Sequence, residues 1–191
     1  MTELISIFVG MALINNFILV RFLGLCPFFG VSKRLGNAVS MGAAVTFVMV
    51  LASAATWLIT EYILIPFDIE YMNIVMYILV IASLVQIIEL FVMRTNYALY
   101  NAFGIYLALI TTNCAVLGIT LINASESYSL LQSIVAALGG GVGFTLVLAI
   151  MSGIRERLEM ADSPKAMKGL PIAFITAMLL GLAFSGFGGI I

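Results

Sequence analysis

The sequence predicts an all-helical membrane protein with six transmembrane helices. Of its 191 residues, 63% are hydrophobic and only 9% are charged, whereas a soluble domain carries roughly 25% charged residues. A single small core cannot bury this much apolar surface. Because a lipid-facing backbone must satisfy its own hydrogen bonds, the spans are predicted to be helices. The whole chain, 1–191, is predicted to form one integral membrane domain.

Six apolar runs are long enough to cross a bilayer, which takes about 20 residues of helix. They are residues 4–20, 38–60, 72–93, 98–122, 130–154 and 170–190. The first run has no basic leader and no small-residue cleavage site, so it is predicted to be a retained span and not a signal peptide. The connecting loops are too short to hold a soluble domain.

The charged residues are segregated between alternate loops. Every basic residue follows the first, third or fifth span: Arg21, Lys33, Arg34, Arg94, Arg155, Arg157, Lys165 and Lys168. The opposite loops carry Glu61, Asp68, Glu70 and Glu126. Because basic loops stay in the cytoplasm, both termini are predicted to face outward. The net charge of −1 offers no basic surplus to bind nucleic acid.

Three spans in each half predict two inverted-topology repeats, at about 1–94 and 95–191. Each half has one cysteine followed four residues later by glycine, as Cys26–Gly30 and Cys114–Gly118. In such folds the functional site lies where the two halves meet. Runs of small residues in the second and fifth spans are predicted to allow close helix packing.

Both cysteine segments are predicted to interrupt regular helix. Residues 22–31 are apolar but too short to cross, and Pro27 disfavours helix at Cys26. A broken or re-entrant element is expected there. In the second half, Thr112 and Asn113 place polar groups beside Cys114, where they are candidates to hydrogen-bond a metal-bound sulfur. The charged run 155–159 is interpreted as a cytoplasmic helix end carrying charge pairs.

The two cysteines are candidate metal ligands. A single free cysteine is more often a small buried hydrophobe, but two in matching positions favour a metal or redox site. The chain has no histidine, which excludes bis-His haem, Rieske centres and most zinc or copper sites. Two thiolates cannot complete a four-coordinate centre, so a partner subunit or a second copy would have to supply two more ligands.

Three segments resemble the A subunits of the Rnf ion-translocating oxidoreductase complex. They are NNFILVRFLGLCPF at 15–28, LITTNCAVLG at 109–118 and GIRERL at 153–158, and the resemblance runs from end to end. The E subunit of the sodium-pumping NADH:quinone oxidoreductase belongs to a sister family. Pro27 and Thr112 favour the Rnf family over that one.

The resemblance implies a membrane subunit of a redox-driven translocase in the plasma membrane of a bacterium or archaeon. It would pair with a homologous subunit, E, inserted in the opposite orientation. Each would supply two cysteines, here Cys26 and Cys114, to one shared [2Fe–2S] cluster. Electron flow between ferredoxin and NAD would be coupled to Na⁺ or H⁺ translocation. Subunits B, C, D and G complete the complex. NADH, ferredoxin and flavins would bind other chains, so no catalytic residue is assigned to this one.

Two alternatives fit the same size and helix count. One is a cofactor-free six-helix transporter, such as the membrane component of a vitamin-uptake system. The other is a scaffold that holds redox subunits without carrying a cofactor. The matched intramembrane cysteines favour the redox hypothesis over both.

Overall fold

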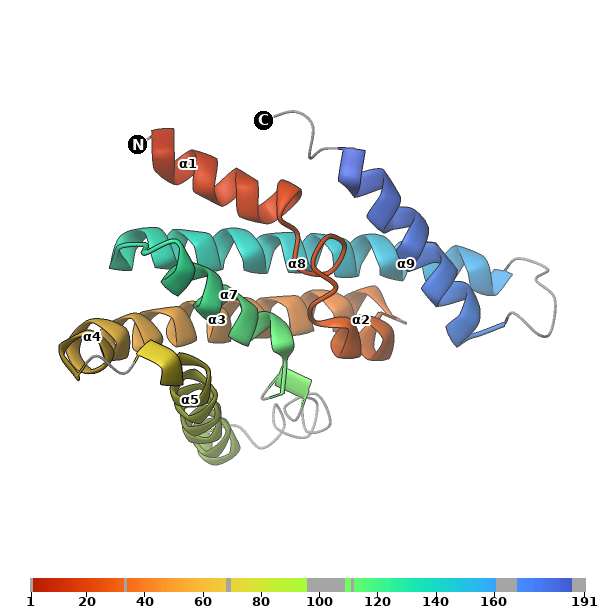
Figure 1. Cartoon of the computed structure of the whole chain (residues 1–191). Helices are drawn as coiled ribbons and strands as arrows, with labels where there is room; N and C mark the ends of the chain where they lie inside the picture. Colours follow the sequence, from red (N-terminus) through yellow and green to blue (C-terminus); the bar gives the residue numbers. More distant parts are fainter. Residues whose placement is uncertain are drawn as a thin grey trace.

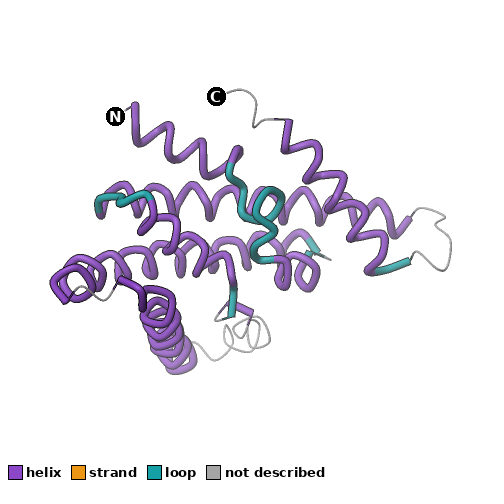
Figure 2. The backbone as a smooth tube through the Cα atoms, viewed as in Figure 1, coloured by secondary structure: helices purple, strands orange, loops and turns teal. Residues whose placement is uncertain are grey.

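The computed structural model describes residues 2–32, 34–67, 70–95, 109–110, 112–160 and 168–186. Across these ranges the chain is helical and contains no strand, as predicted (Figures 1 and 2). The elements are α1 (Thr2–Val9), the π-helical η1 (Gly10–Ile14), α2 (Leu25–Val31), α3 (Leu35–Ile59), the π-helical η2 (Thr60–Leu64), α4 (Ile65–Phe67), η3 (Glu70–Met72), α5 (Asn73–Thr95), α7 (Cys114–Ser125), α8 (Leu130–Met160) and α9 (Leu170–Ser185).

Three helices are long and apolar enough to cross a membrane: Leu35–Leu64, Asn73–Phe91 and Leu130–Met160. The shorter apolar helices are Thr2–Ile14, Cys114–Ser125 and Leu170–Ser185. Each overlaps one of the predicted spans, which confirms a multi-pass membrane protein. Residues 98–108 of the fourth predicted span lie outside the described residues. The side on which each loop lies stays a prediction.

The centre of the molecule is the pair α3 and α8, which run side by side and form its largest helix–helix interface (Figure 1). Glycines let the two backbones approach. A methyl group at Gly141 would lie 2.5 Å from the side chain of Thr46, and one at Gly42 would collide with Thr145. The prediction that the small-residue runs serve close packing is therefore confirmed.

Glycines of α8 also let the first helix, α1 with η1, pack closely against the other face of α8. A methyl group at Gly139 would lie 2.6 Å from the carbonyl oxygen of Phe8, and one at Gly143 would collide with that of Ala12. Backbone atoms cannot swing aside as a side chain can. Both positions therefore require glycine to keep α1 and η1 in place.

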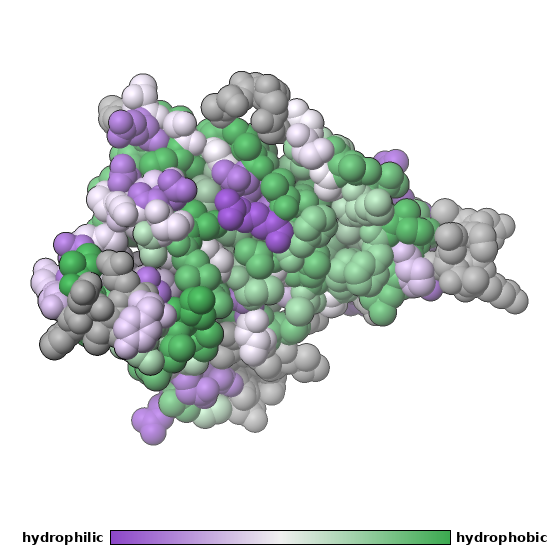
Figure 3. Space-filling view, viewed as in Figure 1, coloured by the Kyte–Doolittle hydropathy of each residue, from purple (hydrophilic) through white to green (hydrophobic). Residues whose placement is uncertain are grey.

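The remaining helices lie around this centre. Helix α7 packs on α3, α5 contacts α3 and α7, and α9 contacts α8 and η1. In its most apolar stretch α5 is only 17% buried, against 56% for α8. The visible surface is largely hydrophobic (Figure 3). Apolar surface on this scale requires lipid or a partner protein to cover it.

The order of elements repeats between the halves. In each, a short helix bearing the cysteine (α2 or α7) precedes a long central helix (α3 or α8), which precedes a further apolar helix (α5 or α9). The division into two inverted repeats stays a prediction.

Candidate functional site

The first cysteine segment begins with a partly buried loop. The predicted span reached residue 20, but the helix ends at Ile14 and residues 15–24 follow without regular helix. Phe17 and Ile18 in this loop are 0% and 1% exposed. Their apolar character reflects burial in protein and not a helix crossing lipid. The expectation of an interrupted element is confirmed. Residues 16–19 of the irregular part are buried, whereas Val20 and Phe22 are 40% and 60% exposed.

Asn16 holds this loop against α8. Its amide Nδ2 donates to the carbonyls of Ala12 at 3.2 Å and Gly143 at 3.1 Å. Its Oδ1 accepts from the backbone N–H groups of Ile18 at 3.1 Å and Leu19 at 3.4 Å. All donors and both acceptor positions of this fully buried amide are thus engaged. The side chain replaces the helical hydrogen bonds lost at the break.

Cys26 lies in the first turn of α2, immediately after the loop. Gly24 precedes this helix with φ of +78°, a left-handed conformation that glycine adopts without strain. Pro27 was expected to disfavour helix at Cys26, but both residues are helical. In the first turn the missing N–H of proline would have no intrahelical partner, so the ring is tolerated there.

The other end of α2 is held by Arg155 of α8. This side chain is 8% exposed, and its Nη1 donates to the Phe29 carbonyl and to Ser32 Oγ, both at 2.9 Å. The run 155–159 lies in the last turns of α8, at a helix end as interpreted, but Arg155 itself is buried and bonds to the α2 segment. The guanidinium instead satisfies a carbonyl near the end of α2, where a helix favours a cation.

The second cysteine segment is also the start of a helix. Cys114 is the first residue of α7, and Asn113 is its N-cap, with Oδ1 accepting from the Ala115 N–H at 3.0 Å. Asn113 is 5% exposed, and among the described residues its Nδ2 has no hydrogen-bond partner. Thr112 beside it is exposed. A buried donor without an acceptor is costly unless a ligand or water satisfies it.

The two segments meet at Gly24. Its N–H donates to Cys114 Sγ at 3.2 Å. A methyl group at Gly24 would lie 3.2 Å from Asn113 Oδ1 and 2.7 Å from the ring of Phe144. The absence of a side chain thus lets the loop before α2 reach the first turn of α7. The fold places Cys26, two residues beyond Gly24, in the same region as Cys114.

Both thiols lie on the surface of the chain. Cys26 and Cys114 are free and exposed. Among the described residues no three His, Cys, Asp or Glu side chains gather in a group able to hold a metal ion. A four-coordinate centre at these cysteines therefore requires ligands beyond those described, and the exposure of both thiols leaves them accessible to a second chain.

Two residues of this site follow from the sequence. Asn16 is a polar residue at the break in the first apolar run, where it was predicted to stabilise the interruption, and its four hydrogen bonds confirm this role. Gly24 is one of the residues predicted to interrupt that segment, and it lies at the break. Arg155 gave no such signal, because its partners lie 126 and 123 residues away.

Comparison with known proteins places this chain in a family. The family described as "Rnf-Nqr subunit, membrane protein" matches residues 4–191. The A subunit of the ion-translocating oxidoreductase complex of Syntrophotalea carbinolica is 51% identical over 100% of this chain and 99% of its own length. Its namesake in Vibrio atlanticus is 52% identical over the full length of both chains. That of Azoarcus sp. is 52% identical over 100% of this chain and 98% of its own. This chain therefore belongs to the Rnf-Nqr family of membrane subunits.

Proposed function

We propose that this chain is the A subunit of an ion-translocating oxidoreductase complex, and that Cys26 and Cys114 hold one side of a [2Fe–2S] cluster. Such a cluster, when bound, supplies a one-electron carrier inside the membrane. The full-length relatives, all named as A subunits of such a complex, support the first part. The geometry of the cysteine segments supports the second.

The observation that carries the proposal is the hydrogen bond from the Gly24 N–H to Cys114 Sγ, at 3.2 Å. It brings the two cysteine segments, half a chain apart, to one place. A backbone N–H aimed at a sulfur stabilises its negative charge, and hydrogen bonds to ligand sulfurs raise the reduction potential of iron–sulfur centres. Gly24 would therefore tune the same ligand that it positions.

The donor set around Cys114 fits a negatively charged cluster. The buried Nδ2 of Asn113 is available as a donor, and Cys114 begins a helix of 12 residues. The N-terminal end of a helix carries partial positive charge, which favours an anionic thiolate. The Nδ2 of Asn113 and the N-terminal end of α7 already lie beside Cys114, so they would stabilise the negative charge on its sulfur without a conformational change.

The missing ligands would come from a homologous subunit of opposite orientation, the E subunit, seated against the exposed thiols. Subunits B, C, D and G would bring the sites for NADH, ferredoxin and flavins. In this arrangement the chain relays electrons across the plasma membrane, and the complex couples that flow to Na⁺ or H⁺ translocation.

The test measures iron, acid-labile sulfide and the EPR signal of the reduced, purified complex. Cys26→Ser and Cys114→Ser are each expected to abolish one [2Fe–2S] signal and remove its iron. Ser83→Ala, a small exposed change on α5, serves as the control. If the full set of signals survives both cysteine substitutions, the cluster assignment is wrong. The cofactor-free transporter would then become the better hypothesis.

A further inference from the structure

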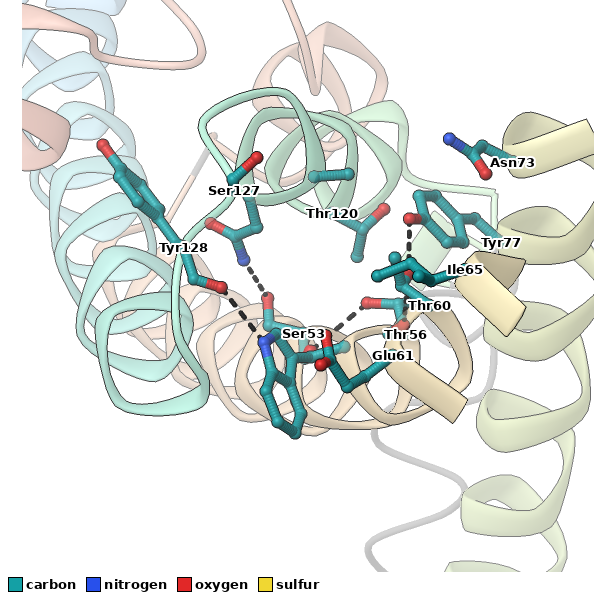
Figure 4. A pocket seen from close by; sticks show the side chains of 13 residues that line it. Ser53, Thr56, Thr60, Glu61, Ile65, Asn73, Tyr77, Thr120, Ser127 and Tyr128 are labelled. Carbon is teal, nitrogen blue, oxygen red and sulfur yellow. Dashed lines mark hydrogen bonds between the residues drawn. The ribbon is translucent and has the colours of Figure 1, made fainter. Parts of the chain in front are cut away.

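A polar cavity of about 260 Å³ lies among α3, η2, α5 and α7 (Figure 4). It is formed where α3 ends, α5 begins and α7 ends. Cys114 lies at the opposite end of α7, so this cavity is separate from the cysteine site. The loops that border it carry acidic residues and were predicted to face outward. The cavity is therefore expected at the outer end of the chain.

The buried residues that line this cavity are polar. Ser53, Thr56, Tyr77, Thr120 and Asn123 are 1%, 3%, 1%, 1% and 7% exposed. They come from α3, α5 and α7 and line one cavity. Figure 4 shows Ser53, Thr56, Tyr77 and Thr120 around it. Buried polar groups need hydrogen-bond partners. Which groups still lack one decides what the cavity can bind.

The threonine protons are already committed to the helix backbone. Thr56 Oγ1 donates to the Ala52 carbonyl at 2.7 Å, and Thr120 Oγ1 donates to the Leu117 carbonyl at 2.8 Å. A hydroxyl has one donor and two acceptor lone pairs. With the proton used, each threonine presents only an acceptor to the cavity.

Tyr77 is committed in the same way. Thr60 Oγ1 donates to the Thr56 carbonyl at 2.8 Å and lies 2.7 Å from Tyr77 Oη. Because the proton of Thr60 is used, Tyr77 must donate in this pair. Its oxygen therefore also keeps only acceptor capacity.

Asn123 adds an acceptor with no partner. Its Nδ2 donates to Ser53 Oγ at 3.2 Å and to the Ser133 carbonyl at 3.5 Å. Its Oδ1 is buried and, among the described residues, accepts no hydrogen bond. Leaving an amide oxygen buried without a partner is unfavourable. A ligand that accepts its lone pair would recover that cost.

Among the described residues that line this cavity, Glu61 is the one that carries a negative charge. It lies on η2 and is exposed at the rim (Figure 4). Tyr128, also on the rim, stays neutral, because burial and then the charge of Glu126 raise the pKa of its phenol. The cavity thus combines four buried oxygen acceptors with a single carboxylate.

We propose that this cavity binds a small monovalent cation, with Na⁺ as the probe. Hard oxygen ligands suit hard cations, and an excess of acceptors repels anions. Protein sites for divalent Ca²⁺ gather several carboxylates, whereas the described lining of this cavity has a single carboxylate among neutral oxygens. Irregular helix such as η2 is also frequent at functional sites. The site goes beyond the electron-carrying role and does not depend on the cysteines.

The test measures ²³Na⁺ NMR line broadening with the isolated full chain in lipid nanodiscs, without iron. Its result is thus independent of whether the cysteines bind a cluster. Trp57 is the only tryptophan of the chain and lines the cavity, with its Nε1 donating to the Tyr128 carbonyl at 3.0 Å. Na⁺ is expected to change its fluorescence at the concentration that saturates the broadening, and choline is not.

Thr120→Val and Thr56→Val each remove one oxygen while preserving shape, and Glu61→Gln removes the charge. Each is expected to weaken Na⁺ binding about tenfold, the equivalent of about 1.4 kcal/mol. Thr176→Val is the matched control, because Thr176 also donates to its own helix, at 2.8 Å to Ile172, but lies on α9 away from the cavity. Glu3→Gln controls for the charge.

Two results would overturn the proposal. One is the absence of saturable broadening with the wild-type chain. The other is unchanged Na⁺ affinity in Thr120→Val, Thr56→Val and Glu61→Gln alike. Circular dichroism and thermal melting of each variant establish that the helices remain, so that a lost signal reports the site and not unfolding.

Discussion

The guanidinium of Arg155 donates to Ser32 Oγ over 2.9 Å, which joins the long helix of the second half to the cysteine helix of the first. The same Nη1 reaches the Phe29 carbonyl. Because α2 has only seven residues, it has little stability of its own. The position of Cys26 therefore depends on contacts like this one at the end of its helix.

Replacing Arg155 with methionine is expected to lower the thermal stability of the chain. The change keeps apolar bulk but leaves Ser32 and the Phe29 carbonyl without their donor. Hydrogen bonds to a charged group contribute about 1.5–3 kcal/mol, which corresponds to a fall in Tm of about 3–12 °C for a chain of this size. Thermal melts of the full chain in detergent measure this fall.

Arg157→Met is the control for that prediction, since Arg157 is exposed on the same helix. It is expected to melt close to the wild type, as exposed charges contribute little. Arg155→Lys should be intermediate, because an ammonium cannot reproduce the planar fork of guanidinium donors. Equal melting temperatures for Arg155→Met and Arg157→Met would contradict the anchoring role.

Asn16→Ala is expected to be among the most destabilising single changes in the loop before α2. The change leaves the carbonyls of Ala12 and Gly143 without their donor. It also leaves the backbone N–H groups of Ile18 and Leu19 without their acceptor in an apolar environment. Each buried group left unpaired costs about 1–3 kcal/mol. Asn15→Ala, at the neighbouring half-buried position, should change the melting temperature far less. A similar loss in both variants would show that the effect is not specific to this network.

Gly24→Ala tests the contact between the two cysteine segments. Alanine must adopt φ of +78° and place its methyl group 2.7 Å from the Phe144 ring. The left-handed conformation alone costs about 1–2 kcal/mol. Because Phe144 is 0% exposed and its ring has little room to move, the clash is expected to displace Gly24 from Cys114 Sγ. The expected results are a lower Tm and faster maleimide labelling of Cys114 in a Cys26→Ser background.

Gly153→Ala is the matched control, because a methyl group there meets nothing within 4 Å in the described structure. Alanine in a helix interior is about 1 kcal/mol more favourable than glycine, so this variant should melt at or above the wild-type temperature. Unchanged labelling of Cys114 in Gly24→Ala would refute the inferred contact.

The sequence was sufficient to locate the cysteine segments, because their signals are local. Gly24 and the polar Asn113 each lie immediately before the helix that carries a thiol, as their residue types predict, whereas Pro27 lies within α2 and does not interrupt it. Hydropathy misplaced the end of the first helix for a physical reason. It measures the preference for burial, and Phe17 is buried in a loop instead of a helix.

The contacts between distant segments could not be predicted in this way. The bond from Asn123 to Ser53 spans 70 residues, and each residue alone is an isolated polar group in an apolar helix. Such a residue is equally compatible with a helix contact or a ligand site. Only the fold reveals that these polar side chains line one cavity. It also reveals that the hydroxyl protons of Thr56 and Thr120 are donated to carbonyls of their own helices.

Two substitutions of Asn113 separate its structural role from its proposed effect on the cluster. Aspartate keeps an oxygen to cap the Ala115 N–H, and the two residues are about equally good N-caps. Asn113→Asp should therefore melt near the wild type, whereas Asn113→Ala loses about 1 kcal/mol of capping. Thermal melting of the two variants measures this difference, and equal losses would contradict the capping role.

The midpoint potential of the cluster should rank Asn113→Asp and Asn113→Ala in a different order from their melting temperatures. Aspartate replaces the Nδ2 donor, which has no partner among the described residues, with a negative charge beside the ligand Cys114. Added negative charge and a lost hydrogen bond both make an iron–sulfur centre harder to reduce. In a redox titration followed by EPR, Asn113→Asp should lower the midpoint potential more than Asn113→Ala, although it is the more stable protein. A purely structural residue would give the opposite ranking, because its effect on the potential would follow the loss of stability.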